Sequence, residues 1–222
     1  MKYLFFSLVV IFNLQSVFSQ TVEVPISKRR IAEIQKKDRE DTQANKLYFG
    51  VEEKCRNLTG ARSFVEAETS CRLAISYAEK LPKDRYLERS SAYESLAYVL
   101  LWQRKTDEAI PLLNKSLEIG KPVIDDTDAE TGEIYFLLGQ AYHQLGKLIE
   151  AREYYTKAET AYQTAFRKID DDEIGGRYPK SIINILKAHL ILLKNAGLNE
   201  EAAKVEKRLA ETKIEFAKFL EN

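Results

Sequence analysis

Two cysteines, Cys55 and Cys71, carry the most reactive side chains of this chain. Their spacing excludes a Cys-x-x-Cys redox pair, and two cysteines without neighbouring histidines are too few ligands for a structural zinc site. The residues themselves leave two interpretations open. The cysteines form a disulfide, as in many exported proteins, or they are free thiols buried as small apolar groups.

The two histidines, His143 and His189, are the next candidates for chemistry. No hydrolase, zinc-protease or nucleotide-binding motif surrounds either of them. The acidic segment 126–130 begins like a calcium-binding loop, but the required glycine and the final glutamate are missing, and the run Asp170–Glu173 fails in the same way. We expect solvated turns and helix caps there, with no metal, no cofactor and no catalytic site, so an enzyme is not predicted.

The N-terminal residues 1–20 have the composition of a secretory signal peptide. Lys2 precedes an apolar run, Tyr3–Phe12, and smaller residues precede a cleavage site after Ser19 or Gln20. The apolar run is about half as long as the ~20 residues that a membrane-spanning helix needs. We predict export to the periplasm or out of the cell, without stable membrane insertion after cleavage; an uncleaved anchor is the alternative.

The charges of the chain are balanced. Lys and Arg together number 34, and Asp and Glu together also number 34. Such a chain has no overall field that would attract nucleic acid or an anionic membrane, so neither is an expected partner. A hydrophobic content of 45% is typical of a folded protein rather than a disordered one.

Apolar residues recur with helical period along the chain, and no segment alternates as a strand would. The period predicts a first helix from about Ser27 to Leu58, ended by Gly60. Its middle, Lys36–Asp41, is entirely polar, and the helix could break there. A second helix is predicted from about Arg62 to Leu81.

Large apolar and small residues recur at the same positions in three segments of equal length, 90–123, 132–165 and 183–216. In the first they are Tyr93, Leu96, Ala97, Leu100, Ala109, Leu113 and Ser116. In the second they are Tyr135, Leu138, Gly139, Tyr142, Ala151, Tyr155 and Ala158, and in the third Leu186, His189, Leu190, Leu193, Ala202, Glu206 and Leu209. This pattern resembles the tetratricopeptide repeat, and the long gaps at 124–131 and 167–182 resemble those of the variant repeats in kinesin light chains.

The resemblance implies an all-α fold, a right-handed α-solenoid of antiparallel helix hairpins over residues 46–222. Three clear units would follow a diverged hairpin at about 49–81, and a helical extension over 21–45 would precede it. The last helix, about Asn199 to Leu220, would cap the array. The gap at 167–182 would be a loop or a helix break.

The same register bears on the cysteines. Counted back from Ala67, Cys55 takes the small-residue position of the first helix of the diverged unit, and Cys71 takes a core position of the second helix. Two antiparallel helices joined by a turn near 59–62 would bring these positions together. The resemblance therefore favours the disulfide, which would clamp the first hairpin and contribute on the order of 3 kcal/mol.

In tetratricopeptide proteins the first helices of successive units line a concave groove that holds a partner. The candidate groove residues in this chain are Glu94, Tyr98, Trp102, Phe136, Gln140, His143, Lys187 and Lys194. The other residues at matching positions are Ser91, Leu101, Glu133, Gln144, Asn184, Ile191 and Asn195. His189 occupies a core position, where we expect a buried, hydrogen-bonded imidazole. For Trp102 and Phe136 the alternative is that they pack against neighbouring repeats.

The function that the resemblance implies is that of an exported scaffold or adaptor. Its partner would be a protein, bound through an extended peptide or a helix in the groove. The alternative is a self-assembling structural or envelope protein, a homo-oligomer in which the exposed ends of the repeats stack between copies.

Overall fold

The computed structural model describes residues 28–168 and 177–217, and over these residues it is entirely helical. The predicted signal peptide and the acidic run Asp170–Glu173 lie outside the described residues. The chain divides into two compact units, residues 1–40 and 41–222. Of the first unit, residues 28–40 form the beginning of helix α2 (Lys28–Gly60), which continues through the polar segment where a break was considered.

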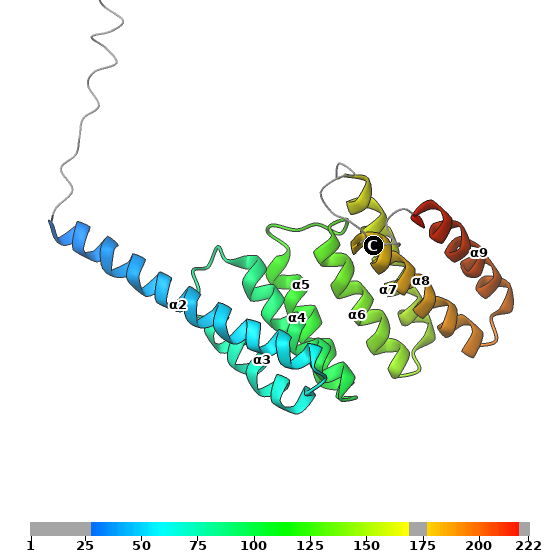
Figure 1. The fold of residues 1–222 in the computed structure, drawn as a ribbon, viewed down its shortest axis with the longest axis horizontal. Coiled ribbons are helices and arrows are strands. Elements are labelled where there is room, and N and C mark those ends of the chain that lie inside the picture. Colours follow the sequence, from blue (N-terminus) through cyan, green and yellow to red (C-terminus); the bar gives the residue numbers. More distant parts are fainter. Residues whose placement is uncertain (1–27, 169–176, 218–222) are drawn as a thin grey trace, which may run out of the picture. The chain divides into compact units, whose positions relative to one another are not determined.

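The second unit consists of antiparallel helix hairpins (Figure 1). The end of α2 pairs with α3 (Phe64–Ala78), α4 (Tyr86–Trp102) with α5 (Thr106–Gly120), α6 (Ala129–Gln144) with α7 (Leu148–Arg167), and α8 (Arg177–Asn195) with α9 (Asn199–Glu215). These hairpins occupy the four predicted repeat units. The all-α solenoid predicted from the resemblance is therefore confirmed.

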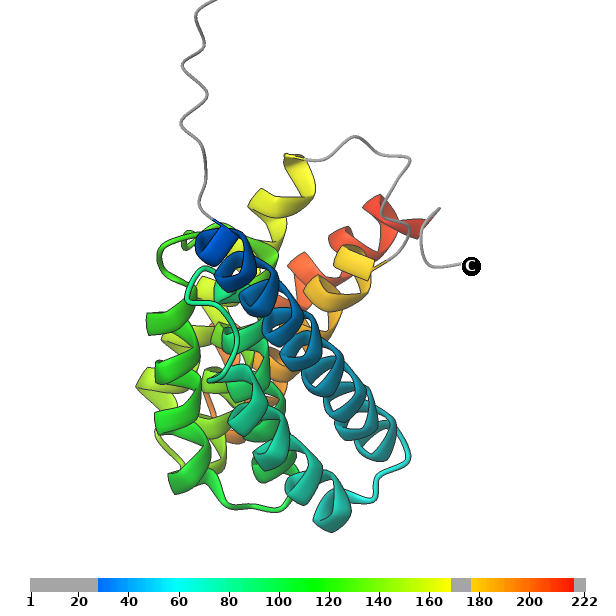
Figure 2. The ribbon, with the colours of Figure 1, turned by 90° about the vertical axis from the view of Figure 1, so that its left-hand side faces the viewer.

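Viewed from the side of α3, the hairpins lie one behind another (Figure 2), and the first helices of successive units are closer together than the second helices. Helices α4, α6 and α8, the first of each unit, contact one another in succession. Within the described residues, the backbones of the second helices α5, α7 and α9 approach the first helices but not one another. The stack is therefore concave on the side of α4, α6 and α8, and it leaves gaps between its second helices.

Small residues on the first helix, at the predicted position of Gly139 and at Gly132, which the pattern did not assign, allow the two helices of a hairpin to approach closely. A Cβ atom added to Gly139 would lie 2.5 Å from a ring carbon of Tyr155, and one added to Gly132 would lie 3.0 Å from the ring of Tyr162. Both tyrosines are buried. The aromatic ring of the second helix thus occupies the volume that a side chain on the first helix would need.

The turn within each hairpin contains one residue in the left-handed region. These residues are Gly146 and Gly197 in the last two units, but Arg62 and Arg104, with φ of 59° and 63°, in the first two. Helix α2 ends at Gly60, as predicted, but the residue with the positive φ is Arg62, two residues later. A non-glycine residue pays a steric cost in this conformation, which the surrounding structure must offset.

The boundaries of several helices differ from the predicted ones. Helix α8 begins at Arg177 and α6 at Ala129, inside segments expected to be gaps, whereas α3 ends at Ala78 instead of Leu81. Pro179 was expected in a loop or break, but it lies in the first turn of α8. Proline is compatible with that turn, because the backbone N–H groups of a first turn have no partner within the helix.

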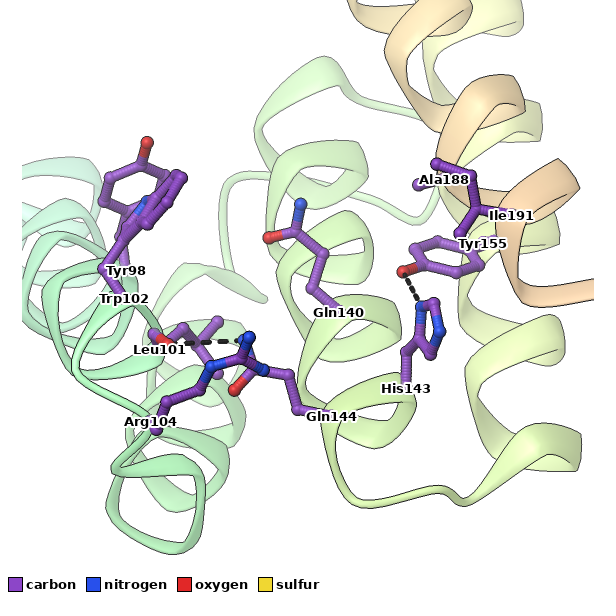
Figure 3. Close-up of a pocket in the computed structure, with 10 residues that line it drawn as sticks. All are labelled: Tyr98, Leu101, Trp102, Arg104, Gln140, His143, Gln144, Tyr155, Ala188 and Ile191. Carbon is purple, nitrogen blue, oxygen red and sulfur yellow. Dashed lines mark hydrogen bonds between the residues drawn. The ribbon is translucent and has the colours of Figure 1, made fainter. Parts of the chain in front are cut away.

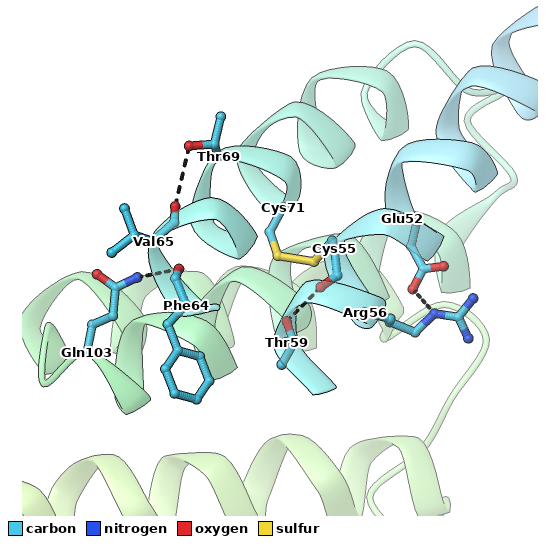
Figure 4. The surroundings of a disulfide bond; sticks show 9 residues. All are labelled: Glu52, Cys55, Arg56, Thr59, Phe64, Val65, Thr69, Cys71 and Gln103. Atoms are coloured by element: carbon cyan, nitrogen blue, oxygen red, sulfur yellow. Dashed lines mark hydrogen bonds and ion pairs between the residues drawn. A yellow bond between two sulfur atoms is a disulfide. The ribbon is translucent and has the colours of Figure 1, made fainter. Parts of the chain in front are cut away.

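The predicted disulfide joins α2 to α3 (Figure 4). The Cα atoms of Cys55 and Cys71 are 5.1 Å apart, and both side chains are buried. On the same turn of α2, the Thr59 hydroxyl donates a 2.7 Å hydrogen bond to the carbonyl oxygen of Cys55. The first hairpin is therefore cross-linked through its core.

The segment 125–128 is a turn before α6, as predicted. Two of its carboxylates accept hydrogen bonds from donors within the same turn. The Asp125 carboxylate accepts hydrogen bonds from the backbone N–H and the hydroxyl of Thr127, and Asp128 accepts one from the backbone N–H of Asp125. In the described part of the chain, no cluster of three or more potential ligands is placed to hold a metal ion. No described helix combines the length and the apolar character needed to cross a membrane.

Candidate functional site

A cleft of about 490 Å³ opens on the concave side of the stack (Figure 3). It is lined by residues of α4, α6, α7 and α8 and by one residue of the turn after α4. They are Tyr98, Leu101, Trp102, Arg104, Gln140, His143, Gln144, Tyr155, Ala188 and Ile191. We call this the inner cleft. Its lining is aromatic, aliphatic and amide-bearing, which is the composition of surfaces that bind peptides.

Trp102 is an exposed aromatic residue that its neighbours hold in place. It lies at the end of α4 with 50% of its surface exposed. Its ring stacks on Phe64 of α3 at a centroid distance of 5.5 Å, and the Arg62 guanidinium lies 5.7 Å from its centroid. Tyr98, one turn earlier, has its ring 6.3 Å away. An immobilised aromatic surface of this kind loses little conformational entropy when a ligand binds to it.

On the other side of the cleft, His143 of α6 faces Tyr155 of α7. The Tyr155 hydroxyl and the His143 Nδ1 atom are 3.4 Å apart, and the two rings meet edge to face. Burial lowers the pKa of the His143 imidazole below its usual value. His143 is therefore neutral at physiological pH, and it can offer a donor and an acceptor rather than a charge.

The two glutamines of the cleft differ in their hydrogen bonding. Gln144 accepts a 2.9 Å hydrogen bond from the Thr106 hydroxyl and donates one of 3.3 Å to the carbonyl oxygen of Leu101. Gln140 has no hydrogen bond to a residue that the structure describes, so its amide can pair with the backbone of a ligand. Arg104 supplies the one charged side chain of the lining.

The structure brings together half of the candidate groove residues. Tyr98, Trp102, Gln140 and His143 line the inner cleft, as do Leu101, Gln144 and Ile191 at matching repeat positions. The other candidates do not line it. Phe136 packs with its ring 6.0 Å from that of Tyr155, and Lys194 forms a 3.0 Å ion pair with Glu206 of α9.

Glu94 is half-buried on α4 and Lys187 is exposed on α8, both away from the lining. For the four residues that do line the cleft, a role in binding stays a prediction. The alternative for Trp102 and Phe136 was that they pack against neighbouring repeats. Phe136 does so, whereas Trp102 packs on Phe64 and is also exposed.

Three lining residues were not predicted from the sequence. Ala188 and Tyr155 occupy positions that the repeat pattern does not assign to the groove, and Tyr155 was assigned to the core. Tyr155 is indeed buried, but it also contributes to the lining of the cleft. Arg104 lies in the turn after α4 and has a positive φ. The repeat pattern assigns groove positions on helices only, so it did not predict a lining residue in a turn.

His189 is buried as predicted, with 4% of its surface exposed, but the expected hydrogen bond is not formed. Neither ring nitrogen has a hydrogen-bond partner among the described residues. Burial, together with the positive charges of Arg208 and Arg152, lowers the pKa of His189 to about 4, while Glu201 opposes this shift. The imidazole lies near Tyr155, with a ring-centroid distance of 5.9 Å, and stays neutral in the folded protein at neutral pH.

This burial predicts a stability that falls as the pH is lowered. Between the ordinary pKa of 6.5 and the folded-state pKa of about 4, the unfolded chain binds a proton at His189 that the folded chain excludes, so acid favours unfolding. The variant His189→Leu is expected to lose this contribution. Urea unfolding of both proteins from pH 7 to pH 4 measures it. The stability of the variant relative to the wild type should rise steadily as the pH falls; a constant difference would contradict the assignment.

Comparison with known proteins identifies the repeat. A family model described as tetratricopeptide repeat matches residues 88–164. No curated protein sequence matches the chain. Among solved structures, the chain is similar to two crystal structures from Podosopora anserina that are described as putative kinesin light chain nearly identical TPR-like repeats.

The first of these, a form of that protein with one substitution, has a TM-score of 0.57 at 15% identity, and the match covers 77% of this chain and 76% of that one. The second has a TM-score of 0.55 at 15% identity, with 76% and 75% covered. At these identities the likeness concerns the fold. Residues 88–164 are therefore identified as tetratricopeptide repeats, and the helices on both sides continue the same hairpin stack in a fold similar to that of kinesin-light-chain-like repeats.

Proposed function

We propose that this protein is an exported scaffold that binds a segment of a partner protein in its inner cleft. Tetratricopeptide repeats are typical of protein–protein interaction scaffolds, and the fold is typically that of a non-catalytic protein. The observation that supports the proposal most is the exposed, immobilised ring of Trp102 at one side of a concave cleft. Opposite it, Gln140 has free amide groups for a peptide backbone.

The chemistry of the cleft suits an extended peptide or one face of a helix. Apolar side chains of the ligand would contact Trp102, Tyr98 and Ile191, and its backbone groups would pair with Gln140 and His143. Export is supported by the disulfide Cys55–Cys71, since disulfides persist in oxidising compartments and are rare in the cytosol. The signal-peptide composition of residues 1–20 supports it independently.

The variant Trp102→Ala is expected to weaken partner binding at least ten-fold, because buried aromatic anchors at interfaces typically contribute about 2 kcal/mol or more. Affinity capture from the envelope and culture medium of the source would supply the partner. Since Trp102 is the only tryptophan of the chain, its fluorescence then reports binding of the purified partner directly.

A matched control is Ile214→Ala on α9, which removes a large apolar side chain that is 78% exposed and does not line the cleft. This variant should capture the partner as well as the wild type does. Equal capture by wild type, Trp102→Ala and Ile214→Ala would show that the inner cleft is not the binding site.

Self-assembly by stacking of repeat ends is less well supported. The buried residues of α9 all face the preceding helices, and its other positions are mostly charged. A charged outer face is what a capping helix needs to remain in water. Light scattering that showed a mass rising with concentration would favour the self-assembling alternative over a scaffold for a different protein.

A further inference from the structure

A second cleft, of about 960 Å³, lies between helices α7 and α9, whose backbones do not approach each other in the described part of the chain, although ion pairs between their side chains connect them. Helix α8 forms its floor. The lining residues are Ile149, Arg152, Glu153, Thr156, Lys157, His189, Leu193, Glu201, Lys204, Val205 and Arg208. We call this the outer cleft. It shares no residue with the inner cleft, and most of its lining comes from the second helices α7 and α9.

The charged lining of the outer cleft is predominantly basic, with four cations and two carboxylates. The carboxylates are already paired: Glu201 with Arg152 at 2.7 Å and Glu153 with Lys157 at 2.6 Å. Arg208 forms a 3.0 Å ion pair with Glu159, which is buried beside the cleft.

Lys204 has no ion pair with a described residue. The positive charge of the cleft therefore exceeds the negative charge even when Glu159 is included. Arg152 and Arg208 also have further N–H groups, since each guanidinium carries five donors and its ion pair involves a single nitrogen.

The floor of the cleft contains a buried polar group without a partner. The His189 imidazole lines the cleft, yet both of its nitrogens lack a hydrogen bond to the described residues. The basic residues on both walls, Arg152 and Arg208, disfavour its protonation. An anion bound between these walls would reverse the local field, and the protonated imidazole would then be favoured.

An apolar surface adjoins the basic one. Ile149, at the start of α7, is 73% exposed and contributes to the outer cleft together with Leu193 and Val205. A small apolar pocket shares Ile149 and Leu193 with it and continues onto Leu148 and Leu198. A free small acid would leave this apolar surface uncovered, whereas a peptide side chain would cover it.

We propose that the outer cleft is a second docking site, which binds an acidic segment of a protein partner. The carboxylates of the segment pair with Lys204, Arg208 and Arg152, and an apolar side chain next to them packs on Ile149. This site acts independently of the inner cleft, so the scaffold can hold two segments at once. Charge complementarity and the adjoining apolar surface together select a peptide with glutamate or aspartate beside leucine-like residues.

The experiment uses the full chain and a synthetic peptide in which glutamates alternate with leucines, labelled for fluorescence anisotropy. The reference peptide has glutamine in place of every glutamate. Free glutarate represents a small carboxylate, and inorganic phosphate represents an anion of another kind. In parallel, NMR of the histidine rings follows the pKa of His189 as the glutamate peptide is added.

Two variants of α9 form a matched pair. Lys204→Glu reverses a charge of the cleft, while Lys213→Glu reverses an exposed charge nine residues later, on the opposite side of a helix with 100° per residue. Neither lysine forms an ion pair with a described residue, so both variants should fold. Far-ultraviolet circular dichroism confirms folding before binding is measured.

We expect the glutamate peptide to bind and the glutamine peptide to bind at least about ten-fold more weakly. Lys204→Glu should lower the affinity for the glutamate peptide about ten-fold or more, whereas Lys213→Glu should lower it less than about two-fold. Binding of the peptide should raise the pKa of His189. Trp102→Ala should leave this binding unchanged, which separates the outer cleft from the function proposed for the inner one.

Several results would overturn the proposal. The glutamate peptide does not bind, both lysine variants weaken it equally, or the pKa of His189 stays constant while the peptide binds. Saturation by glutarate or phosphate with the affinity of the peptide would instead indicate a site for a small anion, and it would exclude a docking site for a protein segment.

Discussion

Replacing Cys55 and Cys71 together by alanine is expected to lower the free energy of unfolding by about 3 kcal/mol. The bond closes a loop of moderate length between α2 and α3, and breaking it restores conformational entropy to the unfolded chain. Both side chains are buried, so their removal also leaves small cavities in the hairpin. The first hairpin has a stacking neighbour, α4, on one side of α3, and it depends on the cross-link more than an internal repeat would.

Urea unfolding of the double variant and of the wild type measures this effect. The wild type treated with reductant is the control, because it loses the bond without changing any side chain. Both should unfold at lower urea concentration than the oxidised wild type. Equal stability of all three samples would mean that the bond does not stabilise the folded protein. The mass of the non-reduced wild type purified from its source also tests the predicted signal peptide, which would be removed as residues 1–19 or 1–20.

The variant Gly139→Ala is expected to destabilise the protein by about 2 kcal/mol, although alanine is the better helix former. The added Cβ would lie 2.5 Å from one ring carbon of Tyr155 and 2.7 Å from another. That ring cannot move away easily, because it is buried between α6, α7 and α8 and contacts Phe136 and His189. The hairpin α6–α7 must therefore open, and packing in the neighbouring core is lost.

The control is Gly50→Ala in α2, where a Cβ would meet no atom within 4 Å. This variant should be neutral or more stable by up to about 1 kcal/mol, as helix propensity alone predicts. Thermal and urea unfolding of the two variants give the comparison. A stabilising effect of both substitutions would contradict the close contact between Gly139 and Tyr155.

The repeat pattern was sufficient to predict the hairpins and the disulfide because the relevant information is local. A helix with small residues at fixed positions can pack closely against the next helix in the chain, and the register then follows from counting. Cys55 and Cys71 face each other for this reason, and Gly139 faces Tyr155 for the same reason. Boundaries were less predictable: Pro179 suggested a break, yet the first turn of a helix accepts proline.

The candidate binding residues were only partly predictable, because exposure at a cleft depends on more than one hairpin. Trp102 and Gln140 occupy repeat positions that face the concave side, and they line the cleft. Phe136 and Lys194 occupy such positions too, but the ring of Phe136 packs against Tyr155 and the Lys194 ammonium forms an ion pair with Glu206. Neither side chain is therefore available in the cleft. The position of a residue in its repeat does not reveal the neighbour that competes for its side chain.

The sequence by itself determined the helical hairpins and their order, and its repeat pattern favoured the pairing of the two cysteines, since each depends on residues close together in the chain. Only the tertiary structure decided which residues meet across repeats. It placed Tyr155 in the lining of the inner cleft, left the nitrogens of His189 without partners among the described residues, and brought Arg152 and Arg208 to the same cleft. The physical reason is that the convergence of the first helices and the separation of the second helices set the distances between repeats. Those distances arise from the packing of the whole stack.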